Sequence, residues 1–214
     1  MPDYSMLKQM KGAIFDLDGV IVDTAKYHYL AWRSLASELG FDFTEADNER
    51  LKGVSRMRSL DILLEIGGLE FTEADKLAMA DKKNRLYVEY ISQLDESELL
   101  PGVSSYLNRL RDSGIGIALG SASRNALFIL DKLNIADLFD AVVDGNKVSR
   151  AKPDPEVFIT ASQELGLQPG DCVVFEDAEA GVAAGKAAGM RVIGIGRPEV
   201  LGEADIVISG LHEL

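Results

Sequence analysis

The stretch Gly12-Ala13-Ile14-Phe15-Asp16-Leu17-Asp18-Gly19 decides the fold of this 214-residue chain. A short run of small and apolar residues ends abruptly in acids and a glycine, which predicts a buried strand followed by a tight turn. The run does not alternate with polar residues, and this is typical of a strand that is covered on both faces of a parallel sheet. Such a strand needs neighbours of the same character.

Later parts of the chain supply these neighbours. Apolar runs of strand length occur at residues 115–119, 141–143, 172–175, 192–195 and 206–208. Segments with helical spacing of apolar residues lie between them, at residues 103–113, 125–133 and 155–165. The alternation of strands and helices predicts an α/β fold with a parallel, Rossmann-like sheet.

The segment from residue 25 to about residue 93 has no convincing strand. Its apolar residues have helical spacing, and glycines such as Gly40, Gly53 and Gly67 interrupt the pattern. We therefore expect an α-helical domain over residues 24–94, inserted into an α/β core made of residues 1–23 and 95–214. The residues before Lys11 lack the apolar segment of a secretory signal, and we expect them to form a short, loose extension.

Composition restricts the class of protein. Hydrophobic residues make up 47% of the chain and charged residues 27%, which argues against wholesale disorder. The 22 basic and 35 acidic side chains give a net charge of −13, which speaks against general binding to nucleic acid or acidic membranes. The only cysteine is Cys172, so an intrachain disulfide and a cysteine-rich zinc site are excluded. We expect a cytoplasmic protein.

Acidic residues follow two of the predicted strands. Asp16 and Asp18 follow the first strand, and Glu176 and Asp177 close a later one. Open α/β sheets place their ligand crevice at such strand ends. Four acids would repel one another unless a cation lies among them, and hard oxygen ligands favour Mg²⁺. One carboxylate can act as nucleophile and another as general acid/base. The alternative interpretation is that strands often end in Asp because Asp favours turns.

Two more strand ends carry groups that suit a phosphate. Residues 121–125 read Ser-Ala-Ser-Arg-Asn and precede a predicted helix, where hydroxyls and helix N-terminal amides can cradle a phosphate. Ser123 could equally serve as a plain N-cap. Pro153 restricts Lys152 to extended conformations, so that Lys152 can present a positive charge. A solvated loop lysine is the more common alternative.

In order and in setting, these groups resemble the four motifs of the haloacid dehalogenase superfamily. Residues 16–24 are similar to its first motif, and Ser121, Lys152 and the Glu176-Asp177 pair fall where the other three would be. The helical insertion is similar to the type-1 cap of that superfamily. Asp18 implies phosphoryl transfer, because the dehalogenating branch lacks this second aspartate. The resemblance implies one Mg²⁺ per chain, with ligands from Asp16, Asp18 (through its carbonyl), Glu176 and Asp177.

The inserted segment is similar to that of the β-phosphoglucomutase family. Thr24, His28 and Trp32 are one helical turn apart and share a face. The residues that the resemblance implies bind sugar or phosphate are Asp23, Thr24, His28, Trp32, Leu51, Lys52, Gly53, Val54, Ser55, Arg56, Ser59, Lys83, Asn84, Ser121, Ala122, Ser123, Arg124, Asn125 and Lys152. Arg124 replaces the family's usual lysine, which keeps the charge but changes hydration and geometry. Taken singly, His28 and Trp32 would more commonly be structural residues.

The resemblance implies a phosphotransferase that interconverts β-glucose 1-phosphate and glucose 6-phosphate. Asp16 and Asp18 would be the catalytic residues, with Asp16 forming an aspartyl phosphate and Asp18 transferring protons. Arg56 would hold the other phosphate, and β-glucose 1,6-bisphosphate would be the priming intermediate. Two alternatives stay open: a phosphatase of the same fold acting on a small phosphorylated metabolite, and a non-catalytic module that binds Mg²⁺ or phosphate. We expect a monomer with a small sugar phosphate as partner, and neither nucleic acid nor membrane.

Overall fold

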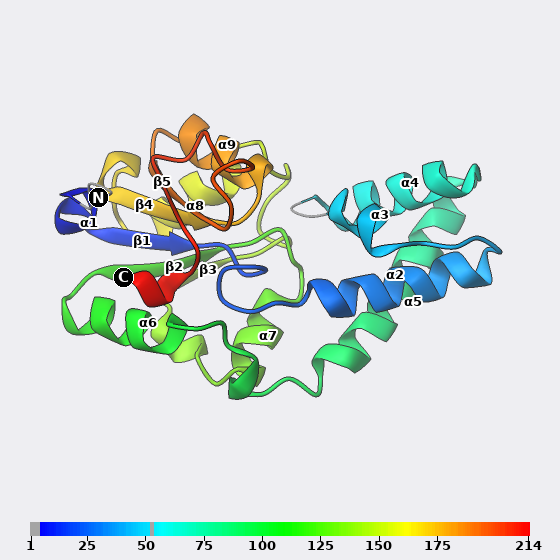
Figure 1. Cartoon of the computed structure of the whole chain (residues 1–214), viewed down its shortest axis with the longest axis horizontal. Helices are drawn as coiled ribbons and strands as arrows, with labels where there is room; N and C mark the ends of the chain where they lie inside the picture. Colours follow the sequence, from blue (N-terminus) through cyan, green and yellow to red (C-terminus); the bar gives the residue numbers. More distant parts are fainter. Residues whose placement is uncertain (1–4, 52–53) are drawn as a thin grey trace. The chain divides into compact units, whose positions relative to one another are not determined.

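The predicted strand at residues 12–15 is β1 (Gly12–Phe15), and it lies inside a parallel sheet (Figure 1). The computed structural model describes residues 5–51 and 54–214, and within these the sheet has six strands in the order β3-β2-β1-β4-β5-β6. The other strands are β2 (Gly116–Gly120), β3 (Ala141–Val143), β4 (Cys172–Glu176), β5 (Arg191–Ile195) and β6 (Ile206–Ile208). Every neighbouring pair is parallel, which confirms the predicted α/β fold.

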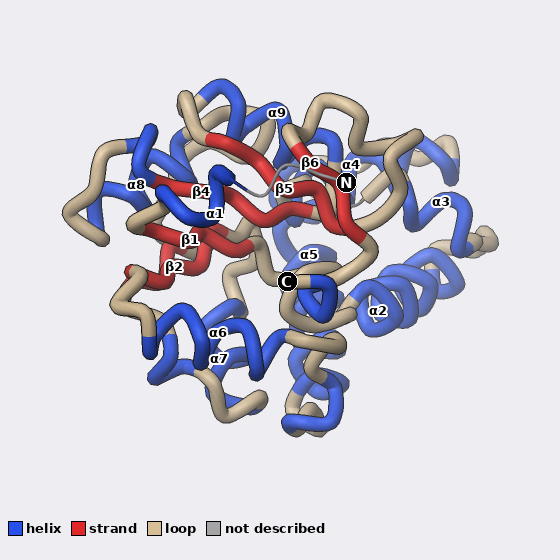
Figure 2. Tube along the Cα trace, turned by 60° about the vertical axis from the view of Figure 1, so that its left-hand side comes forward, coloured by secondary structure: helices blue, strands red, loops and turns tan. Residues whose placement is uncertain are grey.

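Helices cover both faces of the sheet. Figures 1 and 2 show α6 and α7 on one face and α8 and α9 on the opposite face. The α-helices associated with the sheet are α1 (Ser5–Gln9), α6 (Val103–Asp112), α7 (Ala126–Lys132), α8 (Glu156–Glu164) and α9 (Glu179–Ala187). Short 3₁₀ helices are η1 (Glu96–Glu98), η2 (Ala136–Leu138), η3 (Pro169–Asp171) and η4 (Leu211–Glu213). This double cover explains why β1 and β4 are buried along their whole length and read as continuous apolar runs.

The direction of strand addition changes at β1. Phe15 of β1 lies opposite Leu119 of β2 on one side and Phe175 of β4 on the other. The chain adds β2 and β3 on one side of β1 and then returns to add β4, β5 and β6 on the other. The topological switch point therefore lies between β1 and β4, which is where open α/β sheets bind ligands.

Three aromatic rings fix the strand ends at this switch point. The rings of Phe15 and Phe175 stack with centroids 4.5 Å apart, and Tyr106 of α6 meets both edge-on, at 6.2 and 5.6 Å. Each such pair contributes about 0.5–1.5 kcal/mol beyond the burial of its area. Asp16 and Glu176 directly follow two of these aromatic residues in the chain, so the packing of the rings also fixes the backbone positions of the two acidic residues.

The chain divides into two compact units, Met1–Asp23 with Asp95–Leu214 and Thr24–Leu94. We call the first the α/β unit and the second the helical unit. The helices of the helical unit are α2 (Ala25–Glu38), α3 (Glu45–Glu49), α4 (Arg56–Gly67) and α5 (Glu73–Ile91). Thr44, Ser55 and Thr72 cap three of them by accepting a hydrogen bond from the third helical amide. No helix within residues 5–51 or 54–214 is long and apolar enough to cross a membrane.

The expectation of a loose extension before Lys11 is wrong for residues 5–10. Residues Ser5–Gln9 form α1, and the side chains of Met6 and Met10 are buried. The two methionines are four residues apart, so they share one face and can be buried together. The backbone amide of Lys11 then donates to the carbonyl of Asp171 at 2.8 Å, which ties the segment to the rest of the α/β unit.

Candidate active site

A buried ammonium group joins two carboxylates at the switch point. Lys152 Nζ donates to Asp16 Oδ1 at 2.5 Å and to Glu176 Oε1 at 2.6 Å, and the Lys152 side chain is 2% exposed. Burial by itself lowers the pKa of Lys152, but the charges of Asp16 and Glu176 outweigh it and raise that pKa above its ordinary value. Lys152 is therefore a charged residue of the site and not a solvated loop lysine.

Three carboxylates lie close together at this end of the sheet. Among the described residues, Asp16, Glu176 and Asp177 offer oxygen atoms that all lie within 4.8 Å of one another. Burial raises the pKa of Glu176, and the neighbouring Asp16 carboxylate raises it as well, against the effect of Lys152. Three carboxylates and one ammonium leave a formal charge of −2, which one divalent cation would neutralise. An all-oxygen donor set of this kind fits Mg²⁺.

Two glycines leave the room that these carboxylates occupy. Gly19 has a φ of +80°, which favours glycine, and a Cβ there would lie 2.0 Å from Asp177 Oδ2. A Cβ on Gly181 of α9 would lie 1.8 Å from Glu176 Oε1. Sequence reasoning missed Gly181, because a glycine on a helix indicates close packing but not what packs against it.

Asp18 lies in the turn that follows β1. The turn is closed by hydrogen bonds from Gly19 N to the Val22 carbonyl at 2.8 Å and from Ile21 N to the Leu17 carbonyl at 2.9 Å. The Asp18 carboxylate is not part of the cluster formed by Asp16, Glu176 and Asp177. Asp18 itself is half-buried.

The Ser-Ala-Ser-Arg-Asn segment directly follows β2. Ser121 is buried, and its Oγ accepts a hydrogen bond from Ser123 N at 3.1 Å. The Ser123 hydroxyl accepts from Asn125 N at 3.2 Å, and Asn125 is the N-cap residue of α7. Ala122 is half-buried and Arg124 is exposed. The two hydroxyls thus order the turn that begins at the end of β2.

The helical unit holds a second buried ammonium, surrounded by aromatic rings. Lys83 Nζ lies 4.4 Å from the ring centre of Trp32 and 4.7 Å from that of Tyr87, and 2.7 Å from His28 Nδ1. The His28 ring stacks on Tyr87 with centroids 4.0 Å apart. The structure therefore brings His28, Trp32 and Lys83 together. Sequence reasoning missed Tyr87, although it lies one helical turn after Lys83 on α5.

The protonation of His28 follows from these neighbours. Burial, then the charges of Lys83 and Arg56, hold the pKa of His28 well below its ordinary value of 6.5. A lysine ammonium can only donate, so the neutral ring accepts at Nδ1 and carries its proton on Nε2. His28 therefore presents a hydrogen-bond donor on its other side.

The remaining candidates in the helical unit differ in surroundings. Arg56 is the first residue of α4, its side chain is 22% exposed, and its Nη1 lies 4.0 Å from Asp81 Oδ1. Leu51 is buried in the hydrophobic core of the unit, and Val54 packs against that core. Lys52 and Gly53 lie outside the described residues.

Five further candidates complete the set. Ser55 uses its hydroxyl to cap α4 at Arg58 N, at 3.3 Å. Ser59 of α4 and Thr24, the N-cap residue of α2, are buried. Asn84 of α5 is half-buried and Asp23 is exposed.

Known proteins match this chain over most of its length. The haloacid dehalogenase-like hydrolase family matches residues 10–189. A β-phosphoglucomutase of Bacillus subtilis (strain 168) is 46% identical over 96% of this chain and 92% of its own length. A phosphorylated carbohydrates phosphatase of Thermotoga maritima is 34% identical over 87% and 85%. The crystal structure of a β-phosphoglucomutase from Clostridium difficile has a TM-score of 0.93 at 43% identity, covering 96% and 93%.

Proposed function

The chain belongs to the haloacid dehalogenase-like hydrolase family, and on this premise we propose that it acts as a β-phosphoglucomutase. In this reaction β-glucose 1-phosphate and glucose 6-phosphate are interconverted. The observation that carries the proposal is that the similarity to two β-phosphoglucomutases covers 96% of the chain and so includes the helical unit. This matters because the carboxylates and Lys152 suit any phosphoryl transfer, so the helical unit must distinguish a mutase from a phosphatase.

Asp16 is the nucleophile of the proposed mechanism. Its carboxylate attacks the phosphorus, the bond from phosphorus to the sugar oxygen breaks, and an aspartyl phosphate forms. Lys152 and Ser121 offset the charge on the transferring group, which is most of the catalytic task in phosphoryl transfer. Asp16, Glu176, Asp177 and the Asp18 carbonyl would hold a magnesium ion, which would supply further positive charge to the phosphoryl oxygens.

Asp18 moves the protons. It protonates the sugar oxygen as that oxygen leaves, and it later takes the proton from the hydroxyl that attacks the aspartyl phosphate. The intermediate is β-glucose 1,6-bisphosphate, which must turn around so that its other phosphate reaches Asp16. The return of that phosphate to Asp16 regenerates the aspartyl phosphate, so bisphosphate from solution is needed only to form the first one.

The helical unit acts on the rest of the substrate. Arg56 grips the phosphate that is not being transferred, because a guanidinium can pair with two phosphate oxygens at once. His28 offers the donor on Nε2 to a sugar hydroxyl, and Lys83 keeps the ring in that tautomer. By excluding water, the unit makes a sugar hydroxyl and not water the acceptor of the phosphoryl group.

The test is an assay of β-glucose 1-phosphate with and without added β-glucose 1,6-bisphosphate. We expect glucose 6-phosphate to form after a lag that the bisphosphate removes, and we expect excess chelator to stop turnover. Release of free phosphate from many substrates, as fast as glucose 6-phosphate forms, would instead support a second candidate function. That candidate is a phosphatase, favoured by the 34% identical relative.

A further inference from the structure

Lys152 lies in a segment without regular structure. Residues 144–155 connect β3 to α8 and contain neither helix nor strand. Yet the ammonium of Lys152 lies within hydrogen-bond distance of two carboxylates. A lysine side chain has four rotatable bonds, and its backbone must be fixed if the ammonium is to stay there without a large loss of entropy. Something in the α/β unit must therefore hold the loop.

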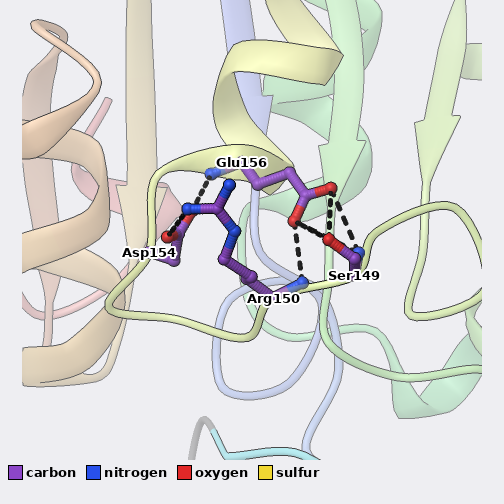
Figure 3. Close-up of polar contacts among 4 residues, drawn as sticks. All are labelled: Ser149, Arg150, Asp154 and Glu156. Atoms are coloured by element: carbon purple, nitrogen blue, oxygen red, sulfur yellow. Dashed lines mark hydrogen bonds and ion pairs between the residues drawn. The ribbon is translucent and has the colours of Figure 1, made fainter.

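Glu156, the first residue of α8, provides the first tie (Figure 3). Its carboxylate accepts from Ser149 N at 3.1 Å, from Ser149 Oγ at 3.0 Å and from Arg150 N at 2.7 Å. The backbone hydrogen bonds from Ser149 and Arg150 lower the pKa of Glu156 below its ordinary value. The carboxylate thus binds a part of the loop that precedes Lys152 by two or three residues.

Asp154 provides a second tie across the same residue. Arg150 Nη1 donates to Asp154 Oδ2 at 2.9 Å, and Glu156 N donates to Asp154 Oδ1 at 3.0 Å. Together the two ties join residues 149–150 to residues 154–156, so that Lys152 lies in the middle of a closed ring of hydrogen bonds. Figure 3 shows the Glu156 carboxylate at Ser149 and the backbone of Arg150, and Asp154 at the Arg150 side chain.

We propose that Glu156 is a positioning residue for the phosphoryl-transfer reaction, which acts by holding the loop that places the Lys152 ammonium between Asp16 and Glu176. The inference rests on the proposed function only in that it takes Lys152 to stabilise the transferring phosphoryl group. Glu156 itself touches neither Asp16 nor Glu176 in the contacts described, so its effect must pass through Lys152.

The first experiment compares Glu156→Gln with Glu164→Gln. Glutamine keeps one accepting oxygen but replaces the other with an amide nitrogen, which cannot accept from Ser149 N or Arg150 N, so the tie is weakened at nearly constant size. We expect kcat to fall by about 10–100-fold with KM changed by less than about threefold, the scale of lost supporting contacts at a catalytic group. Glu164 is the matched control, because it also lies on α8 and also binds the loop, through Lys147 Nζ at 2.9 Å. Its variant should keep kcat within about twofold of wild type. Equal kcat in the two variants, or a change in KM alone, would overturn the proposal.

The second experiment tests whether Glu156 acts through Lys152. The reaction rate of the Lys152→Met variant is measured with enzyme in excess over substrate. Adding Glu156→Gln to this variant should lower the rate by less than about a further twofold. If the rate losses of the two single substitutions multiply in the double variant, Glu156 supports the fold in general and the proposal is wrong. Arg150→Met offers an independent check, because that side chain is 71% exposed and its removal leaves the core intact. Arg150→Met should lower kcat several-fold with KM unchanged. An unaltered kcat would contradict the claim that the ring of hydrogen bonds positions Lys152.

Both experiments are read from two products, glucose 6-phosphate and the phosphate released from p-nitrophenyl phosphate. If wild type releases phosphate but makes no glucose 6-phosphate, the proposed function fails. The coupling of Glu156 to Lys152 can still be read from phosphate release in that case. If glucose 6-phosphate forms and the coupling is absent, the positioning role alone fails.

Discussion

Replacing Lys152 by methionine should destabilise the metal-free protein strongly. The change removes a cation that is 2% exposed and leaves Asp16 and Glu176 facing each other in the buried site. Breaking a buried ion pair by removing one partner costs about 3–5 kcal/mol, because the remaining charge is uncompensated. Natural stabilities are about 5–15 kcal/mol, so this is a large share of the total.

The loss of stability in Lys152→Met should depend on pH and on divalent cations. Burial already raises the pKa of Glu176, and loss of Lys152 raises it further. The folded variant then binds a proton that the unfolded chain has released, so its stability falls as pH rises above the ordinary carboxyl range towards the raised pKa. The variant should therefore be closer to wild type at pH 5 than at pH 8. Added Mg²⁺ should recover part of the loss, because binding to the folded state alone stabilises it.

The measurement is urea unfolding in metal-free buffer, followed by far-UV circular dichroism. Fluorescence is unsuitable because the only tryptophan, Trp32, lies in the helical unit while Lys152 lies in the α/β unit. Lys147→Met is the matched control, since it removes the same charge from a lysine that pairs with Glu164 at 2.9 Å but is 47% exposed. Exposed pairs of this kind contribute at most about 1 kcal/mol. If the two variants lose similar stability at pH 8, the reasoning about the buried ion pairs is refuted.

Three further predictions concern catalysis and pH. Asp18→Asn should bind substrate but lose about 10²–10⁴-fold in kcat, and a kcat within a few-fold of wild type would contradict the acid/base role. Arg56→Ala should cost about 2–5 kcal/mol in kcat/KM for glucose 6-phosphate formation but far less for hydrolysis of an aryl phosphate, which has no second phosphate to bind; equal losses would favour the phosphatase. His28 has a lowered pKa, caused by burial and then by Lys83 and Arg56, so below about pH 6.5 the unfolded chain takes up a proton that the folded chain does not. Stability should therefore fall with decreasing pH, with a slope approaching about 1.4 kcal/mol per pH unit, and urea unfolding should show this component lost in His28→Gln but kept in His212→Gln.

The positions of the strands could be read from the sequence because they depend on local properties. A short apolar run that ends in Asp16-Leu17-Asp18-Gly19 favours a buried strand followed by a turn, because it is too short for a helix and is bounded by turn residues. The predicted strand at residues 12–15 coincides with β1, and the one at residues 141–143 with β3. The α/β class followed from the same alternation of strands and helices. The predicted looseness before Lys11 failed for residues 5–10, because a five-residue helix has too few residues for a periodic signal and its order depends on where Met6 and Met10 are buried.

The arrangement of charges around the site was decided by the tertiary structure alone. Lys152 is 136 residues from Asp16 and 24 from Glu176, so the sequence could single it out as a candidate but could not show which carboxylates it contacts. Its contacts exist because β1 and β4 are neighbours in the sheet and because Glu156 holds the loop of Lys152 against their ends. The same holds for Gly181, whose missing Cβ matters only because the Glu176 carboxylate lies beside it. Periodicity reports which face of an element is buried, whereas the partner across a contact is set by how the elements pack, and the energies of buried charges depend on that partner.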